Sequence, residues 1–317
     1  KLSQVVPEEY ISGPAFSVFH FITSVEEGFD VELGFPVTQR VETDEIKSRI
    51  LPAIEVLALV HKSPIEKMRE SSGKLYASAY KYGLISDEFS REIYLDSNNP
   101  EGNEIEIQFV LHNWDALLTK NLDRVLGKEE RKKVMQEKIS LESTLDVRFQ
   151  WSKGCIEQLE RRGNIDQNYD IISSCAHVFP KDQIAKLRIV YEKTRNETKD
   201  PFKGVDAVIE FMDKDPGWPG PPIREGNIIY SAKSPCNQQA YDKAKNKAER
   251  KKAYCFCPIV RNHLDRGMPS TFCYCGAGWY RQQWEGALGK PVKIEIVKSL
   301  LKDDELCQFA IHLPDDL

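Results

Sequence analysis

The cysteines of this chain are confined to one part of it. All eight lie at or after Cys155, and the first 154 residues contain none. Two Cys-x-Cys units, Cys255-Phe256-Cys257 and Cys273-Tyr274-Cys275, stand close together near the end. A length of 317 residues exceeds what one ordinary core holds. We therefore expect two domains of different chemistry, the first without cysteines and the second rich in them.

The composition is that of a soluble globular protein, with 41% hydrophobic and 29% charged residues. No run of about 18 apolar residues occurs, which predicts no membrane span. The start, Lys1-Leu2-Ser3-Gln4, does not read as a secretory signal, and clustered thiols without such a signal are typical of a reducing compartment. We expect a cytoplasmic protein, and the lack of an initiator Met is compatible with a longer natural chain.

The charge is distributed unevenly along the chain. Residues 1–112 hold 10 Lys and Arg against 19 Asp and Glu, whereas the net charge of the whole chain is −5. An acidic module repels phosphate backbones and favours cationic partners. No helix-turn-helix pattern with basic flanks is apparent, so we expect no direct contact with nucleic acid.

The N-terminal part contains a repeated pair of strands. Apolar patterns predict strands at 16–21, 30–37, 54–60, 90–95 and 104–110, of which 30–37 alternates and 54–60 is mostly apolar, and a helix from Ser63 to Gly83. The second strand of each pair matches at an offset of 74 residues, so that Glu32 corresponds to Glu106. An internal duplication of this kind suggests two units that share one sheet.

An ordered set of motifs in this part resembles the GyrI-like effector-binding domain. The motifs are Gly13-Pro14-x-Phe16, the strand Asp30–Val37, Leu51-Pro52-Ala53, Lys62-Ser63-Pro64 and Arg91–Leu95, over about residues 5–112. The family supplies the ligand modules of AraC- and MerR-type multidrug regulators. The resemblance implies two β-α-β-β units with a groove that binds hydrophobic cations, and some free-standing members look like hydrolases of reactive xenobiotics.

A groove for cations needs a carboxylate and aromatic faces, because aromatic rings attract cations by roughly 0.5–2 kcal/mol each. The resemblance places the ligand-facing acid at Glu92. The aromatic candidates for ligand binding are Phe16, Phe19, Tyr76 and Tyr94.

The remaining chain is predicted to be helical first and mixed afterwards. We expect a helical connector at 113–144, helices at 145–162, 167–178, 181–196 and 202–213, and an irregular segment at 216–222. A strand at 227–231, a basic helix at 238–252, a strand at 254–260, a helix from 269 to 289 and strands at 292–297 and 306–312 follow. The predicted fold class is α+β, with domains at 1–112 and 145–317.

The last segment carries a second resemblance. Its motifs are Cys-Pro at 257–258, Cys-x-Cys-Gly-x-Gly-Trp at 273–279, Trp-Glu-x-x-Leu-Gly-x-Pro-Val at 284–292 and Cys-x-Phe-Ala-Ile-His-Leu-Pro at 307–314. They are similar to the vinyl-reductase-like domain and to the L-2-amino-thiazoline-4-carboxylic acid hydrolase-like family. The resemblance implies a helix-plus-antiparallel-sheet fold that holds a small molecule, with cysteines near it.

Three interpretations of the cysteines remain open. Cys255, Cys257, Cys273 and Cys275 could supply the four thiolates of a tetrahedral zinc site. Alternatively, Cys273 or Cys275 acts as a nucleophile activated by a helix N-terminus; no general base is adjacent in the sequence, although His263 could move into reach. In the third interpretation the cysteines fill a core, as cysteine commonly does.

These observations support three functions. The first is a cytoplasmic binding protein that senses or sequesters a small hydrophobic or cationic molecule. The second is a hydrolase of small reactive or heterocyclic compounds, with Glu92 or Cys273 in the catalytic role. The third is an interaction protein whose C-terminus is stiffened by zinc. A homodimer or a regulatory protein partner is compatible with each of them, and no membrane partner is expected.

Overall fold

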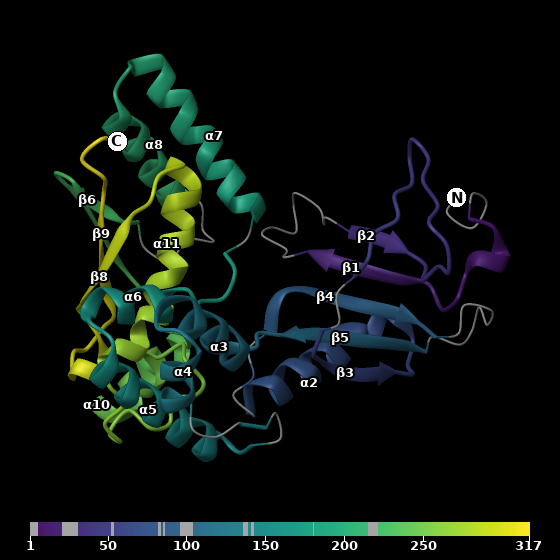
Figure 1. Cartoon of the computed structure of the whole chain (residues 1–317), viewed down its shortest axis with the longest axis horizontal. Coiled ribbons are helices and arrows are strands. Elements are labelled where there is room, and N and C mark those ends of the chain that lie inside the picture. The colour runs from purple at the N-terminus through teal and green to yellow at the C-terminus, as the bar shows by residue number, and fades with distance from the viewer. Residues whose placement is uncertain are drawn as a thin grey trace. The chain divides into compact units, whose positions relative to one another are not determined.

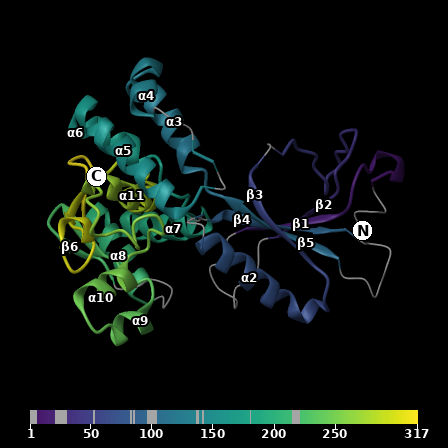
Figure 2. The same ribbon diagram turned by 90° about the horizontal axis from the view of Figure 1, so that it is seen from below.

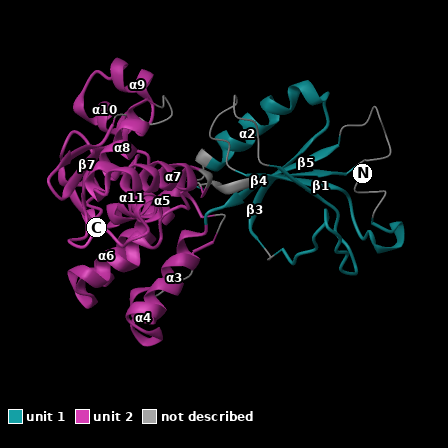
Figure 3. Ribbon diagram, turned by 90° about the horizontal axis from the view of Figure 1, so that it is seen from above, with its two compact units in different colours: residues 1–112 teal, residues 113–317 magenta. Residues whose placement is uncertain are grey.

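The computed structural model describes residues 6–20, 31–51, 54–81, 84, 86–95, 104–135, 139–140, 143–179, 181–214 and 221–317 (Figure 1). The chain divides into two compact units, Lys1–His112 and Asn113–Leu317 (Figure 3). Each unit combines helices with an antiparallel sheet. The predicted α+β class is therefore confirmed.

The first unit is built on a five-stranded antiparallel sheet with the order β2-β1-β4-β5-β3. Strands β2 and β5 contain alternating apolar and polar residues, as strands with two unlike faces do, whereas β3 is almost wholly apolar. The bounds are β1 Phe16–His20, β2 Val31–Gly34, β3 Val56–His61, β4 Ser86–Tyr94 and β5 Ile105–Leu111, with the short helices η1 Glu8–Tyr10 and η2 Ile65–Lys67 and the helix α2 Met68–Lys81.

The register of the sheet shows the internal repeat. Val18 on β1 is paired with Glu32 on β2, and Ile93 on β4 is paired with Glu106 on β5. This register is compatible with the predicted correspondence of Glu32 with Glu106. Because β1 and β4 also pair with each other in antiparallel fashion, the two strand pairs are related by a pseudo-twofold axis between these strands.

Helix α2 lies against one face of this sheet (Figure 2). Leu75 of α2 is 3% exposed and packs with Ile105 and Ile107 of β5. The buried His61 at the end of β3 contacts the Ser71 hydroxyl of α2 through its Nδ1, at 2.9 Å. Apolar packing and this hydrogen bond together hold the helix on the sheet.

The second unit packs helices around a four-stranded antiparallel sheet with the order β6-β7-β9-β8. Its helices are α3 Trp114–Val125, α4 Lys128–Val134, α5 Leu145–Arg162, α6 Ile165–Ser173, α7 Lys181–Thr198, α8 Pro201–Lys214, α9 Gln238–Lys243, α10 Lys247–Tyr254 and α11 Tyr274–Leu288, with η3 Ser270–Cys273 and η4 Leu300–Lys302. Its strands are β6 Ile223–Glu225, β7 Ile228–Ala232, β8 Lys293–Lys298 and β9 Gln308–His312.

Residues 113–135 are part of the second unit instead of forming a connector. Leu118 and Leu122 of α3 are fully buried in a cluster with Phe149 of α5. A helix that buries its apolar stripe in a core belongs to that core. The chain turns between α3 and α4 at Gly127, whose φ of 85° is readily adopted only by glycine.

The strand expected at 254–260 does not form. Helix α10 continues to Tyr254, and residues 258–262 form turns. Arg261 is 7% exposed, and its guanidinium donates to the carbonyl oxygens of Cys255 and Phe256 at 2.5 and 3.0 Å. These carbonyl groups are thus satisfied by a side chain and not by a neighbouring strand.

Some expected features fall outside the described residues, among them the start of the second strand at Asp30, Pro52-Ala53, the helix end at Gly83 and most of the irregular segment at 216–222. Among the helices that the structure describes, none has the length and apolar character needed to cross a membrane.

Candidate functional site

The centre of the first sheet brings a buried serine and a carboxylate together. Ser17 of β1 is directly opposite Glu92 of β4, so both side chains lie on the same face. Tyr94 lies two residues after Glu92 and shares this face because side chains alternate along a strand. The Tyr94 hydroxyl donates to Glu92 Oε2 at 3.2 Å and lies 2.8 Å from the Ser17 hydroxyl. The three side chains form one continuous hydrogen-bonded row.

Phe19 also belongs to this face. It is paired with Ser90, two residues before Glu92, and it is half-buried. Under the pseudo-twofold relation Phe19 occupies the place of Tyr94, so an aromatic residue flanks the centre on each side. The structure thus brings Phe19, Glu92 and Tyr94 to one face, as the binding hypothesis requires.

Phe16 lies on the opposite face, which corrects its assignment to the same site. It is three residues before Phe19, and an odd spacing along a strand reverses the side. Its ring lies over Gly34 of β2, where an added Cβ would be 2.8 Å from the Phe16 Cζ atom. Phe16 packs on the backbone of β2 and has a structural role there.

Tyr76 reaches the edge of the candidate face from α2. Its side chain is 61% exposed, and its ring meets Phe109 edge to face with centroids 6.4 Å apart. Phe109 is paired with Ser90 and with Leu57, which places it on the same face as Glu92. The aromatic set of this face is therefore Phe19, Tyr94, Phe109 and Tyr76.

The electrostatic environment of Glu92 disfavours its charge. Burial raises the pKa of the carboxyl above its ordinary value, while the Tyr94 hydrogen bond and the charge of His61 act in the opposite direction. Burial likewise raises the pKa of Tyr94, which remains a neutral hydroxyl donor. A half-buried carboxylate has lost part of its hydration and has only one hydrogen bond here. Binding of a cation next to it would stabilise its negative charge.

Ser17 was not predicted as a site residue. It is only 1% exposed and supplies the second partner of the Tyr94 hydroxyl. The internal repeat could have pointed to Ser17, because Ser17 is the counterpart of Glu92 in the first strand pair. The sequence offset in this pair of strands is 75 and not 74, so alignment of the second strands alone did not reveal it.

The cysteines of the second unit lie at the start of α11 and around it. Cys273 lies 3.3 Å from the Ser299 hydroxyl, and the Cys275 thiol contacts the backbone oxygen of Cys175 at 3.5 Å. Within the described ranges no three or more His, Cys, Asp or Glu side chains are arranged to hold a metal ion. The zinc interpretation of Cys255, Cys257, Cys273 and Cys275 stays a prediction.

The environment of Cys273 does not activate it as a nucleophile. Burial raises the pKa of its thiol to about 12, although the Ser299 contact lowers it in part. His263, the expected base, contacts the carbonyl oxygen of Ile259 at 3.0 Å and lies 3.7 Å from Asp146. Its two ring nitrogens are thus directed to other groups, and no contact of His263 with Cys273 occurs among the described residues.

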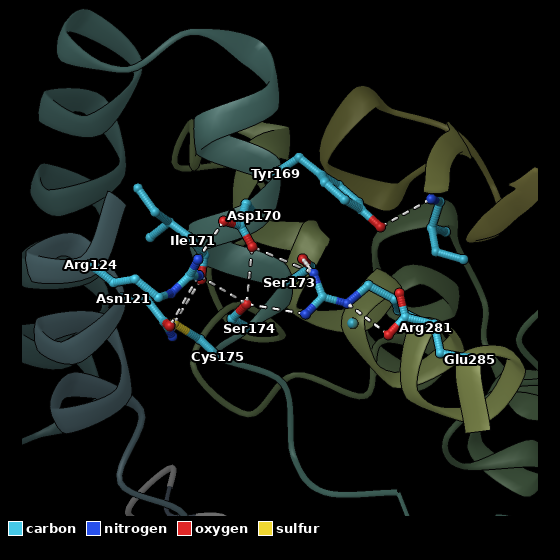
Figure 4. Close-up of polar contacts among 12 residues, drawn as sticks. Asn121, Arg124, Tyr169, Asp170, Ile171, Ser173, Ser174, Cys175, Arg281 and Glu285 are labelled. Atoms are coloured by element: carbon cyan, nitrogen blue, oxygen red, sulfur yellow. Dashed lines mark hydrogen bonds and ion pairs between the residues drawn. The ribbon is translucent and has the colours of Figure 1, made fainter. Parts of the chain in front are cut away.

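Helix α11 is fixed by a polar network with α6 and α3 (Figure 4). Arg281 of α11 donates to the hydroxyls of Ser173 and Ser174 at 2.7 and 3.2 Å. Asp170 of α6 accepts from Arg124 of α3 at 2.7 Å. Guanidinium groups that bind several fixed acceptors orient helices well, so this network holds the cysteine-bearing helix in register.

A comparison with protein families finds that residues 1–111 match the model of the GyrI-like small molecule binding domain. The match covers the whole sheet described above, with Glu92 and Tyr94 at its centre. The first unit is thus a GyrI-like small-molecule binding domain. No curated protein and no solved structure matches the chain.

Proposed function

We propose that the first unit binds small hydrophobic cations and that the protein acts as a sensor or sequestering protein for them in the cytoplasm. The observation that carries this proposal is the position of Glu92 between the aromatic residues Phe19 and Tyr94 on one face of the sheet. A half-buried carboxylate is stabilised when a cation binds next to it. Each aromatic ring adds roughly 0.5–2 kcal/mol to the binding of the cation.

The acidic character of residues 1–112 supports the same ligand class. A negative field attracts cations from solution and raises their local concentration near the site. The family match supports small-molecule binding, and the cationic, hydrophobic nature of the ligand follows from Glu92 and its aromatic neighbours. In this proposal the chain contacts no DNA itself, and it passes the ligand signal to a partner or only retains the ligand.

Calorimetry with tetraphenylphosphonium, compared with the uncharged triphenylphosphine oxide, tests the proposal. We expect the cation to bind and the neutral compound to bind at least tenfold more weakly. Glu92→Gln should reduce cation affinity at least tenfold. The matched control is Glu106→Gln, because Glu106 lies on the same sheet but on the opposite face. Equal loss in both variants, or no loss in Glu92→Gln, would show that the site is elsewhere.

A hydrolase of small reactive compounds is the second candidate. It is favoured by the raised pKa of Glu92 and its hydrogen bond to Tyr94, because a general acid or base works best with a pKa nearer to neutrality. In this case mass spectrometry of each compound after incubation would detect a hydrolysed product. Recovery of every compound intact would favour the binding function.

The second unit has the helix-plus-antiparallel-sheet architecture that the vinyl-reductase-like resemblance implies. We infer a small-molecule role for it as well, on the basis of the partly buried thiols around α11. This proposal does not require zinc, which stays a prediction from the sequence.

A further inference from the structure

Lys233 occupies a fixed position in the second unit. It follows directly after β7, and its backbone N–H donates to the carbonyl oxygen of Cys307 at 3.1 Å. The hydroxyl of Tyr254 donates to the Lys233 carbonyl oxygen from α10. Because the backbone N–H and the carbonyl oxygen of Lys233 are both hydrogen-bonded, the position of its Cα and Cβ atoms is well defined.

The side chain of Lys233 leads into the thiol-rich region. Its Nζ lies 5.2 Å from the centroid of the Phe256 ring and 3.5 Å from the place of a Cβ on Gly276. Its charge favours the ionised forms of the surrounding groups, namely Cys236, Cys257, Cys273, Cys275, Cys307 and Tyr280. One ammonium group therefore lies within electrostatic reach of five thiols and a phenol.

This ammonium group has no anionic counterpart in the described part of the chain. No ion pair or hydrogen bond of Lys233 Nζ occurs there, and its ring contact is with Phe256. The thiols do not supply the negative charge, since burial raises their pKa above the ordinary value. Gly276 also lies in the first turn of α11, whose N-terminal end carries a partial positive charge.

Several side chains of this region are partly exposed. Lys233, Cys257 and Cys273 are half-buried, and Phe256 is 47% exposed. The rings of Tyr280 and Phe309 are tilted against each other with centroids 5.0 Å apart, and Phe309, like Lys233 Nζ, lies 3.5 Å from the place of a Cβ on Gly276. An unneutralised cation, aromatic rings and neutral thiols together match a molecule that has one negative group and a flat apolar body.

We propose that Lys233 anchors a second ligand site, in the second unit, for a small organic anion. The carboxylate of the ligand pairs with Lys233 Nζ, and its apolar part packs against Phe256, Tyr280 and the neutral thiols. This inference does not depend on the cation site of the first unit, because the two sites lie in different units and select opposite charges. The chain thus has the means to respond to two classes of molecule.

The test is calorimetry of the full chain with 1-naphthoate and with the uncharged 1-naphthamide. Wild-type protein should bind the anion, with at least tenfold preference over the amide. Lys233→Met should lower naphthoate affinity at least tenfold, and Lys233→Arg should retain part of it. Lys298→Met, which removes an exposed lysine of β8, should leave the affinity unchanged.

A second variant tests the site without removing the charge. In Gly276→Ala the new Cβ meets Lys233 Nζ and Phe309 at 3.5 Å, an ordinary contact, so the fold is retained. It should weaken naphthoate binding by partly filling the site, whereas Glu92→Gln should not affect it. Absence of naphthoate binding in wild type, or equal affinity in wild type and Lys233→Met, would overturn the proposal. Rapid alkylation of a thiol at pH 7 that depends on Lys233 would also overturn it, because a thiolate would then be the counter-ion.

Discussion

Ser17 and Glu92 face each other across β1 and β4 on the pseudo-twofold axis of the first sheet. They are equivalent positions of the repeat, yet one is a small hydroxyl and the other a carboxylate. Two carboxylates on the axis would repel each other, since like charges at close range raise one pKa strongly. Only one of the two equivalent positions is therefore an acid. The Ser17 hydroxyl contacts the Tyr94 hydroxyl, which donates a hydrogen bond to Glu92.

The pH dependence of cation binding should follow the ionisation of Glu92. Burial raises the pKa of this carboxyl, so its protonated form persists to a higher pH than in a free side chain. Tetraphenylphosphonium affinity should rise with pH through that pKa, by at most about tenfold per pH unit, because one proton is released. Calorimetry between pH 4 and pH 8 measures this slope. Glu92→Gln should show a flat profile, and a wild-type profile without a slope contradicts the assignment.

The same shift predicts a stability effect without ligand. The pKa of Glu92 is higher in the folded than in the unfolded state. The wild type therefore loses stability as the pH rises from the pKa of the unfolded state to the pKa of the folded state. Glu92→Gln lacks this loss, and its thermal midpoint at pH 7 should be slightly higher than that of wild type. The gain should stay below about 1 kcal/mol because the group is partly exposed to solvent. The difference should disappear in acid, and a variant less stable at pH 7 would contradict the prediction.

Ser17→Ala should destabilise the first unit by about 1 kcal/mol, because the Tyr94 hydroxyl loses one partner in a buried setting. Urea denaturation, followed by circular dichroism, measures the change. Ser12→Ala is the control, since Ser12 is exposed and should give a change near zero. Cation affinity should fall only slightly in Ser17→Ala, because the Tyr94–Glu92 hydrogen bond remains.

Gly278→Ala should disrupt the second unit. An added Cβ would lie 1.9 Å from the carbonyl oxygen of Ser173 and 2.7 Å from the Ala176 Cβ, so α11 and α6 would have to separate. The expected cost is about 3 kcal/mol or more, which denaturant unfolding measures. Gly154→Ala on α5 is the matched control, because nothing lies within 4 Å of its Cβ position. That variant should gain about 0.5–1 kcal/mol, the usual preference of a helix for alanine.

Asp170→Asn should weaken the network between α3, α6 and α11. The hydrogen bond from Arg124 lowers the pKa of Asp170, so the carboxylate stabilises the fold at neutral pH. This contribution is lost as pH falls through the lowered pKa, and wild type and variant should then converge. Both side chains are partly exposed, which limits the effect to about 1 kcal/mol. Thermal melts at several pH values, with the exposed Asp265→Asn as reference, measure it.

The main elements of the first sheet followed from local pattern. Apolar patterns located all five strands, and the resemblance around Arg91–Leu95 placed Glu92 and Tyr94 among the candidate ligand-binding residues. Phe16 and Phe19 were assigned together, although an odd spacing along a strand places them on opposite faces. Ser17 was not recognised, because only the cross-strand register shows which residue faces Glu92.

By itself, the sequence indicated the α+β class and the duplicated strand pairs, and its resemblance to the GyrI-like family singled out Glu92 as the candidate acid. These depend on periodicity and on motifs that neighbouring residues carry. Tertiary structure alone decided which residues share a face of the sheet. It also decided that Arg261 donates hydrogen bonds to carbonyl groups of the segment expected to be a strand, and that Lys233 lies near the thiols. Such relations join residues far apart in the chain through packing and charge, and no local pattern encodes them.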